Sequence, residues 1–411
     1  MLTEVRSESD AAQFPWLLEL WARCQEIPLY RARVAGGGSG PGGFFQLPFV
    51  TKREMRENFP HNFLRPGQEL ETLLGANLVE LEYTSGTSED RVPVLLERGW
   101  WERQERRALE LNPFVRAVLR DCSTLRRATL TTPACNGVVC PSRWLTRAQR
   151  TLGGALSLNQ ARIPFLLTPA EQSQMAAEVT DWAPTFLDCD PVHGVWFARY
   201  CERQGIRFPS LKFVLCSYEF VSVTHRRIIE RALGVPVFNL YGATETGHLL
   251  MESAPGQMQA SAETAFLEVV DANASGVGDL VVTTLTNGYM PLVRYHIGDL
   301  VARRGDDYLV HGRKRDALQT APGQRVTTWQ VDQCFAGLAG IAHYQLRQLA
   351  VGQFHLRYIG DGVGPDDAEL RQLISRLEKL LHAHGQITSE AVDVLVPSPS
   401  GKFRLTLPHE N

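Results

Sequence analysis

Four short polar segments along this chain carry side chains suited to phosphate, ribose and metal chemistry. A hydroxyl-rich turn at 84–88 can offer backbone N–H groups and hydroxyls to phosphate oxygens, because Gly86 permits a close approach. Thr244 and Glu245 follow an apolar stretch at 235–240, so they stand where a strand of an α/β sheet would end and could hold phosphate and Mg²⁺. Each of these segments, taken alone, is also an ordinary turn or strand end.

The two later segments add a carboxylate and basic groups. Asp299 could accept hydrogen bonds from the two hydroxyls of a ribose, although after Gly298 it could equally be a turn aspartate. The basic run at 313–315 and the isolated Lys402 are, taken singly, most simply solvated charges. A glycine-rich stretch at 36–43 lacks the Lys and Ser/Thr of a P-loop, so we predict a flexible connector there.

The elements that must position these residues follow an α/β pattern up to residue 312. Short apolar strands alternate with amphipathic helices from about residue 77 onward. One such unit has a strand at 213–216, a helix at 222–233 and a strand at 235–241. Ligands of such folds bind in the crevice at the carboxyl ends of the strands, which is where Thr244 and Glu245 are expected.

A different pattern follows residue 312. We expect a strand over 345–359, a helix over 366–384 and a strand over 391–396. The leucines at helical spacing in 366–384 are predicted to be core, and two aspartates at its start suit the N-terminus of a helix.

Length supports two domains, because a single core stops growing near ~250–300 residues and this chain has 411. We predict an α/β protein with a large multi-layer N-terminal domain at 1–312. A small α+β C-terminal domain at 313–411 would carry Lys402.

Composition excludes several classes of function. The formal net charge is −3, with 42 basic and 45 acidic residues, which gives no electrostatic case for a nucleic-acid partner. No stretch approaches the ~20 apolar residues of a membrane span, and the acidic N-terminus is not that of a secretory leader. The eight cysteines form no C-x-x-C pair and are expected to be reduced thiols in a cytoplasmic protein.

Taken together, the order and spacing of the polar segments resemble the adenylate-forming, or acyl-activating, superfamily, and the flanking sequence is similar to its phenylacetate–CoA ligase-like branch. Five segments carry the resemblance: Tyr-Thr-Ser-Gly-Thr-Ser (83–88), Tyr-Gly-Ala-Thr-Glu (241–245), Arg-Tyr-His-Ile-Gly-Asp-Leu (294–300), Gly-Arg-Lys-Arg-Asp (312–316) and Gly-Lys-Phe-Arg (401–404). Three more resemble that branch: Gln-Leu-Pro-Phe-Val-Thr-Lys (46–52), Thr-Thr-Leu-Thr (283–286) and Pro-Leu-Val-Arg-Tyr (291–295). The similarity extends from about residue 15 to residue 407.

The resemblance implies an ATP site. Tyr241 and Gly242 would flank adenine, and Asp299, assisted by Arg313, would grip the ribose hydroxyls. The phosphate loop would consist of Thr84, Ser85, Gly86, Thr87 and Ser88.

The resemblance also implies the catalytic groups and the cofactors. Thr244 would contact phosphate, Glu245 would hold Mg²⁺, and Lys402 would be the adenylation lysine. Arg315 would occupy a hinge about which the small C-terminal domain moves, and Gly323 would line the acceptor channel. The implied enzyme is an AMP-forming acid–thiol ligase that uses ATP and Mg²⁺, with CoA or a pantetheinyl thiol as co-substrate.

The chain departs from that family pattern at several positions. Glu89 and Asp90 stand in the phosphate loop, where acidic groups should repel ATP. Tyr218 replaces the usual glycine before Glu219. The stretch 252–263 contains no cysteine, so we expect no structural zinc.

The substrates stay open at this level. The acid pocket is expected near 131–139, Tyr218 and Ala243, and the resemblance favours an aromatic acid. The acceptor could be CoA, a carrier protein or an amine. A catalytically decayed nucleotide-binding protein is the alternative from another class, and a homodimer stays open.

Overall fold

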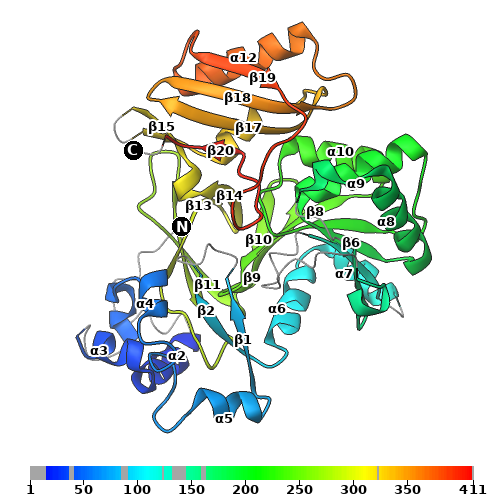
Figure 1. Cartoon of the computed structure of the whole chain (residues 1–411). Helices are drawn as coiled ribbons and strands as arrows, with labels where there is room; N and C mark the ends of the chain where they lie inside the picture. Colours follow the sequence, from blue (N-terminus) through cyan, green and yellow to red (C-terminus); the bar gives the residue numbers. More distant parts are fainter. Residues whose placement is uncertain are drawn as a thin grey trace.

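The computed structural model describes residues 15–36, 41–84, 91–122, 125–131, 145–158, 163–321 and 324–409. Across these ranges a 12-stranded sheet runs in the order β11-β12-β13-β14-β10-β9-β8-β7-β6-β3-β5-β4 (Figure 1). Its strands are β3 (Arg127–Leu130), β4 (Thr151–Leu152), β5 (Ala155–Ser157), β6 (Phe186–Cys189), β7 (Phe213–Cys216), β8 (Val237–Ala243), β9 (Gly247–Ala254), β10 (Gln257–Ala260), β11 (Ala265–Val270), β12 (Val277–Thr284), β13 (Tyr295–Arg304) and β14 (Asp307–Arg313).

One half of the sheet is the predicted α/β layer. Strands β5, β3, β6, β7 and β8 are parallel neighbours, and every residue of β6 and β7 is buried, as in a sheet covered on both faces. Its helices are α8 (Pro169–Trp182), α9 (Pro191–Gln204) and α10 (Val223–Leu233). Each helix begins after a side-chain cap, Thr168, Asp190 or Ser222, so the helix predicted at 222–233 starts one residue later.

The other half is antiparallel and begins where β8 turns back into β9. A separate hairpin pairs β1 (Val79–Tyr83) with β2 (Pro93–Glu97). The helices that accompany these strands are α2 (Pro15–Glu26), α3 (Pro28–Gly36), α4 (Lys52–Arg56), α5 (Leu70–Gly75), α6 (Trp100–Leu109) and α7 (Pro113–Asp121). The connector predicted at 36–43 is wrong at its end, because a 3-10 helix, η1 (Pro41–Gln46), packs Phe44 into the core.

A smaller α+β unit follows residue 313, in yellow to red in Figure 1. Its four-stranded sheet has the order β19-β18-β17-β20, from β17 (Ile341–Ala350), β18 (Gln353–Gly360), β19 (Ile387–Ala391) and β20 (Thr406–Leu407). Helix α12 (Asp367–Leu381) buries Leu373, Leu377 and Leu381, which confirms the predicted core stripe. Helix α11 (Thr328–Gln333) and the pair β15 (Leu318–Ala321) and β16 (Gln324–Val326) complete the unit.

Two strand predictions in this unit are wrong. The single strand expected at 345–359 is a hairpin, because the chain reverses at Val351-Gly352, where Gly352 has φ +78°. The strand expected at 391–396 ends at residue 391, because the polar segment β19 pairs with the edge of β18 instead.

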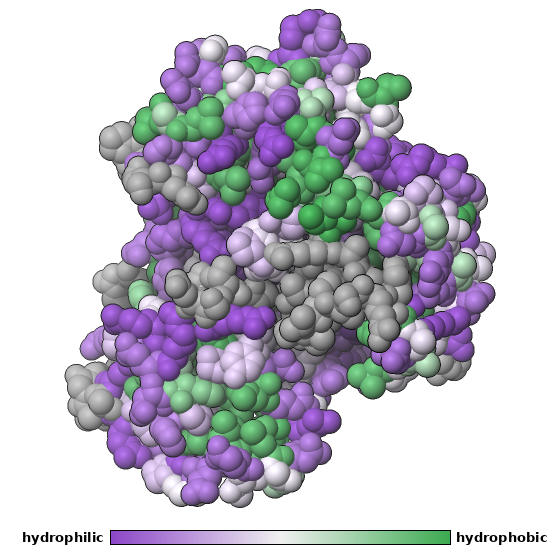
Figure 2. Space-filling model, in the orientation of Figure 1, coloured by the Kyte–Doolittle hydropathy of each residue, from purple (hydrophilic) through white to green (hydrophobic). Residues whose placement is uncertain are grey.

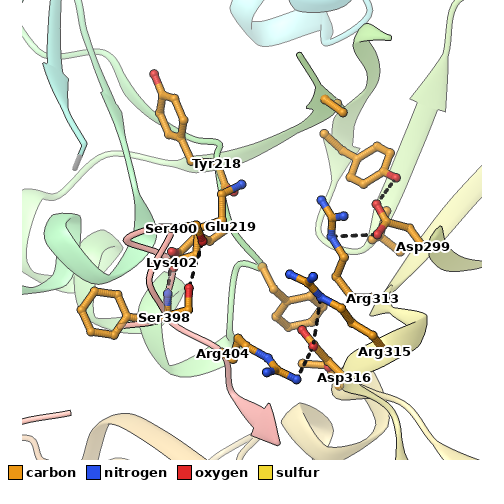
Figure 3. A pocket seen from close by; sticks show the side chains of 18 of the residues that line it. Tyr218, Glu219, Asp299, Arg313, Arg315, Asp316, Ser398, Ser400, Lys402 and Arg404 are labelled. Atoms are coloured by element: carbon orange, nitrogen blue, oxygen red, sulfur yellow. Dashed lines mark hydrogen bonds and ion pairs between the residues drawn. The ribbon is translucent and has the colours of Figure 1, made fainter. Parts of the chain in front are cut away.

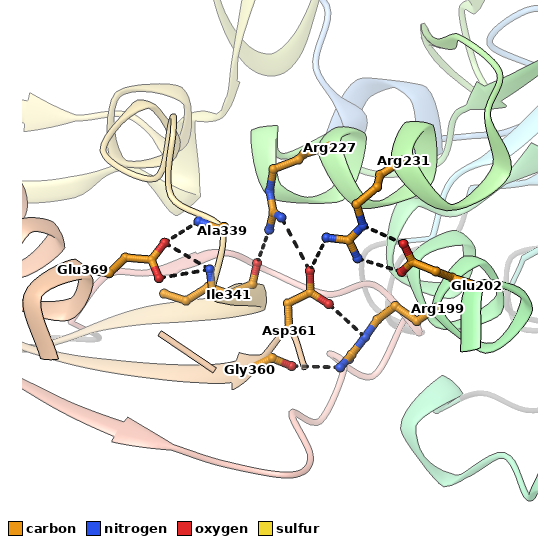
Figure 4. Close-up of polar contacts among 10 residues, drawn as sticks. Arg199, Glu202, Arg227, Arg231, Ala339, Ile341, Gly360, Asp361 and Glu369 are labelled. Atoms are coloured by element: carbon orange, nitrogen blue, oxygen red, sulfur yellow. Dashed lines mark hydrogen bonds and ion pairs between the residues drawn. The ribbon is translucent and has the colours of Figure 1, made fainter. Parts of the chain in front are cut away.

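A partly exposed ion cluster joins the smaller unit to helices α9 and α10 (Figure 4). Asp361 follows β18 and lies 2.8 Å from Arg231 Nη1, 3.5 Å from Arg227 Nη1 and 3.4 Å from Arg199 Nε. Glu202 pairs with the same Arg231 at 2.8 Å. Figure 2 shows apolar surface close to this junction, within a largely hydrophilic face.

The boundary between domains at residue 312 stays a prediction. A hydrophobic cluster from Leu318 to Leu405 forms the centre of the smaller unit, with Phe220 and Val223 packed against it from the larger one. No helix in the described part of the chain is long and apolar enough to cross a bilayer.

Candidate active site

A cavity of about 360 Å³ opens beyond the carboxyl ends of β7 and β8, where the smaller unit faces the large sheet (Figure 3). Ligands of parallel α/β sheets bind at this edge. The cavity collects residues that are far apart in the sequence. Among its lining residues are Thr84, Tyr241, Gly242, Thr244, Glu245, Asp299, Arg313 and Lys402.

Lys402 enters the cavity from a tight turn at 398–402, which we call the lysine turn. Backbone bonds of 2.8 Å from Ser398 N to Lys402 O and from Gly401 N to Ser398 O close it, and Gly401 has φ +86°. Lys402 Nζ donates to the backbone carbonyl of Tyr218 at 2.7 Å. The lysine is half-buried and is held by the turn after β7, so it is not the freely solvated tail residue that its isolation in sequence favours.

Asp299 is held from two sides. Tyr241 Oη donates to Asp299 Oδ2 at 2.5 Å, and Arg313 Nε lies 3.1 Å from Asp299 Oδ1. The three residues meet because β13 pairs with β14 so that Asp299 faces Arg313, while β8 brings Tyr241. The Asp299 carboxylate raises the pKa of Arg313, and burial together with Asp299 raises the pKa of Tyr241. Asp299 is therefore a fixed, buried hydrogen-bond acceptor.

Glu245 is a buried carboxylate that lines the same cavity, just after the end of β8. Tyr295 Oη donates to Glu245 Oε1 at 2.8 Å, and burial followed by the Glu245 charge raises the pKa of Tyr295. This hydrogen bond holds the carboxylate through one of its two oxygens. A carboxylate oxygen at a cavity edge is a ligand that Mg²⁺ prefers, so Glu245 fits the role of a magnesium ligand.

Gly242 has no room for a side chain. A Cβ at this position would lie 2.2 Å from the carbonyl oxygen of Gly247, because β8 and β9 cross closely there. Gly242 also lines the cavity beside Tyr241.

Thr84 stands at the start of the predicted phosphate loop. Its backbone N–H donates to Val92 O at 3.1 Å, and its Oγ1 accepts from Val92 N at 3.0 Å. The other predicted members of this loop, Ser85, Gly86, Thr87 and Ser88, lie outside the described residues, as do Glu89 and Asp90.

No known family model matches the chain. Among curated proteins, it is 26% identical over 299 residues to the phenylacetate–coenzyme A ligase of Thermus thermophilus, which aligns 67% of this chain with 61% of that protein. Among solved structures, it superposes on a 2-hydroxyisobutyryl-CoA ligase in the postadenylation state with TM-score 0.70 and 15% identity, over 98% of this chain and 90% of that one. ATP-bound MatB from Rhodopseudomonas palustris superposes with TM-score 0.53 and 15% identity, over 79% of this chain and 66% of that one.

The chain is thus similar in sequence to phenylacetate–CoA ligases and has the fold of acyl-CoA ligases of known structure, which agrees with the resemblance carried by its motifs. The aligned part spans about three-fifths, 61%, of the Thermus thermophilus protein. The predicted fold class is confirmed, with a large α/β body and a separate C-terminal unit.

The chain differs from the adenylate-forming pattern at Tyr218, which adopts a glycine-like φ of +73°. Its side chain points away from Lys402 in Figure 3, and its hydroxyl donates to Asp188 Oδ2 at 3.1 Å. Asp188 also accepts from Ser217 Oγ at 2.8 Å and lies 3.6 Å from Arg127. Of the acid pocket predicted at 131–139, only residue 131 lies within the described residues.

Two members of the site stand in or beside the motifs, but the sequence predicted no role for them. Glu219 accepts a hydrogen bond from the backbone of Phe403 at 2.6 Å, beside Lys402. Asp316 binds Arg404 at 2.7 Å, below the lysine turn. The position of Glu219, three residues after the end of a parallel strand, is the signal that could have found it. The hinge candidate Arg315 is exposed, and Gly323 lies outside the described residues.

Proposed function

We propose that this chain is an AMP-forming acid–thiol ligase, which activates a carboxylic acid with ATP and transfers the acyl group to a thiol, with CoA as the first candidate. The observation that carries the proposal is that Lys402, Glu245 and the Tyr241–Asp299–Arg313 cluster line the same cavity. Such a set of a cation, a metal ligand and a ribose acceptor suits nucleotide-dependent acyl activation.

The nucleoside half of ATP would bind against β8. Asp299, fixed by Tyr241 and Arg313, would accept hydrogen bonds from the two ribose hydroxyls. Adenine would lie against the backbone of Gly242, which lines the cavity. The phosphates would then extend toward Thr244 and the loop that starts at Thr84.

The reaction has two balanced steps. A carboxylate oxygen of the acid attacks the α-phosphorus of ATP, the bond to the β-phosphate oxygen breaks, and pyrophosphate leaves. The sulfur of the thiol then attacks the acyl carbon and its proton passes to solvent; a thioester forms, the bond from the acyl carbon to the phosphate oxygen breaks, and AMP leaves.

The charges that build up in the first step explain two of the side chains. Lys402 Nζ would contact the oxygens on which negative charge collects as one anion attacks another. Glu245 would hold Mg²⁺, which would supply further neutralisation of the phosphates when bound. After this step, movement of the unit 313–411 would withdraw Lys402 and admit the thiol.

The identity of the acid is the finer part of the proposal. An aromatic acid is favoured by the relationship to phenylacetate–CoA ligase, while the structurally similar 2-hydroxyisobutyryl-CoA ligase points to a small hydroxy acid. A carrier-protein pantetheine or an amine would be alternative acceptors of the same acyl-AMP.

Acid-dependent exchange of pyrophosphate into ATP tests the proposal directly. Folded protein with Mg²⁺ and ATP is assayed over aromatic, heteroaromatic and short hydroxy acids, and we expect exchange with at least one class. Product masses with and without CoA then distinguish a CoA ligase from transfer to another acceptor. No exchange with any acid would refute the proposal and leave a decayed nucleotide-binding protein.

A further inference from the structure

Tyr218 and Glu219, the second and third residues after β7, hold Lys402 at the end of the lysine turn and Phe403, the residue that follows it. Tyr218 O accepts from Lys402 Nζ at 2.7 Å, and Glu219 Oε1 accepts from Phe403 N at 2.6 Å. Figure 3 shows Glu219 directly above Lys402. The first hydrogen bond holds the side chain of Lys402, and the second holds the backbone amide of the next residue. Together they fix the direction in which Lys402 enters the cavity.

The side chain of Phe403 gives the same segment a third anchor. Its ring lies 5.4 Å from Phe165, 5.5 Å from His343 and 6.3 Å from His193, measured between ring centroids. This aromatic cluster fixes the position of Phe403, while Glu219 Oε1 fixes the orientation of its N–H group. Of these contacts, only the hydrogen bond to Glu219 sets the direction of the Phe403 N–H group.

Glu219 has a carboxylate as its neighbour, and that neighbour lacks a donor. Asp190, wholly buried, caps α9 through Oδ1, which accepts from Val192 N at 2.9 Å and His193 N at 3.3 Å. Asp190 Oδ2 has no hydrogen-bond partner within the described residues. Burial and the charge of Asp190 raise the pKa of Glu219 well above its usual range. A proton on Glu219 would supply the donor that Asp190 Oδ2 lacks.

A neutral Glu219 matters for the neighbouring lysine. An ionised carboxylate beside Lys402 would attract the ammonium and offset its charge where the α-phosphate must be stabilised. A protonated Glu219 can still accept from Phe403 N through its carbonyl oxygen, so it holds the turn without neutralising the lysine.

We propose that Glu219 is a positioning residue for adenylation, which holds the backbone N–H of Phe403 and thereby the direction in which Lys402 enters the cavity. The proposal rests on the function proposed above for Lys402. It assigns no contact between Glu219 and the reacting atoms.

Three variants test this assignment by half-reaction. Glu219→Ala loses the Phe403 contact and should slow acyl-AMP formation by ~10–10²-fold, since a misplacement of ~1 Å can cost that much. Glu219→Gln keeps a neutral acceptor and a donor for Asp190, and should stay near the parent rate. Glu369→Ala is the matched control, because Glu369 likewise accepts from a backbone amide, Gly340 N at 3.0 Å, and does not line the cavity (Figure 4). Thioester formation from synthetic acyl-AMP should be near the parent rate in all three.

A readout independent of turnover uses the five lysines of the chain, which are Lys52, Lys212, Lys314, Lys379 and Lys402. Acetic anhydride labelling, resolved by mass spectrometry, reports the accessibility of Lys402 relative to the other four. We expect faster labelling of Lys402 in Glu219→Ala and parent-like labelling in Glu219→Gln.

Unchanged Lys402 labelling in Glu219→Ala would overturn the proposal, and so would equal loss of both half-reactions or a Glu219→Gln variant as impaired as Glu219→Ala. If Glu219→Ala does not fold, Glu219→Asp, which is one methylene shorter, carries the same expectations. A parent protein that exchanges no pyrophosphate would refute the proposed function, while the labelling result would still decide the role of Glu219.

Discussion

Replacing His225 by glutamine should make the protein less sensitive to mild acid. His225 of α10 and His343 of β17 join the two units, with Nε2 of the first 3.0 Å from Nδ1 of the second. Both side chains are almost wholly buried. Burial lowers the pKa of His225 to about 4, and burial together with His225 lowers the pKa of His343. The pair is therefore neutral in the folded protein.

The sign and size of the effect follow from proton binding. An unfolded histidine has a pKa of about 6.5, so between pH 6.5 and 4 the unfolded chain binds a proton that folded His225 does not. Stability present at pH 7 is therefore lost as the pH falls through this window. For His225 alone the free energy of unfolding should fall by about 2 kcal/mol between pH 7 and pH 5.

Urea unfolding at pH 7 and pH 5 measures this difference. The side-chain amide introduced by His225→Gln can still donate to His343 Nδ1, so this variant should lose about 2 kcal/mol less than the parent on acidification. His384→Gln, at an exposed position, is the control and should behave as the parent does. Asp332, whose pKa burial raises to about 6, titrates in the opposite sense but equally in all three proteins. An equal loss in parent and His225→Gln would refute the reasoning.

Two further predictions concern the cavity. Lys402→Ala should slow acyl-AMP formation by ~10²–10³-fold, which is the cost of one lost electrostatic contact to a transition state. Transfer from synthetic acyl-AMP should continue near the parent rate. Equal loss of both steps would exclude an adenylation role for Lys402. Glu245→Gln should reduce pyrophosphate exchange by roughly 10²-fold and raise the Mg²⁺ concentration needed for it, because an amide is a poorer ligand. Its melting temperature should stay near that of the parent, since the glutamine can accept from Tyr295; unchanged exchange would mean that Glu245 binds no metal.

Much of the fold could be predicted because its signals are local. The parallel strand β7 and helix α10 follow from an apolar run and an amphipathic period with a serine cap at Ser222. The leucine stripe of α12 identified its core face for the same reason. Strand β19 was missed because its residues are polar and gain their pairing only from the edge of β18, a preference that depends on tertiary context.

The sequence by itself predicted which side chains belong to the site. The order of the motifs, through its resemblance to the adenylate-forming superfamily, predicted Glu245, Asp299, Arg313 and Lys402 as a set, and all four line one cavity. This prediction needs only the order of the residues along the chain.

Only the tertiary structure decided how these residues are held. Tyr241 meets Asp299 because β8 and β13 converge at the cavity, and Tyr295 meets Glu245 in the same way. Glu219 accepts a hydrogen bond from the backbone of Phe403, and no motif predicts this contact between residues 184 positions apart. The physical reason is that contacts between residues far apart in the sequence depend on how whole helices and strands pack. A motif shows only which side chains the chemistry needs.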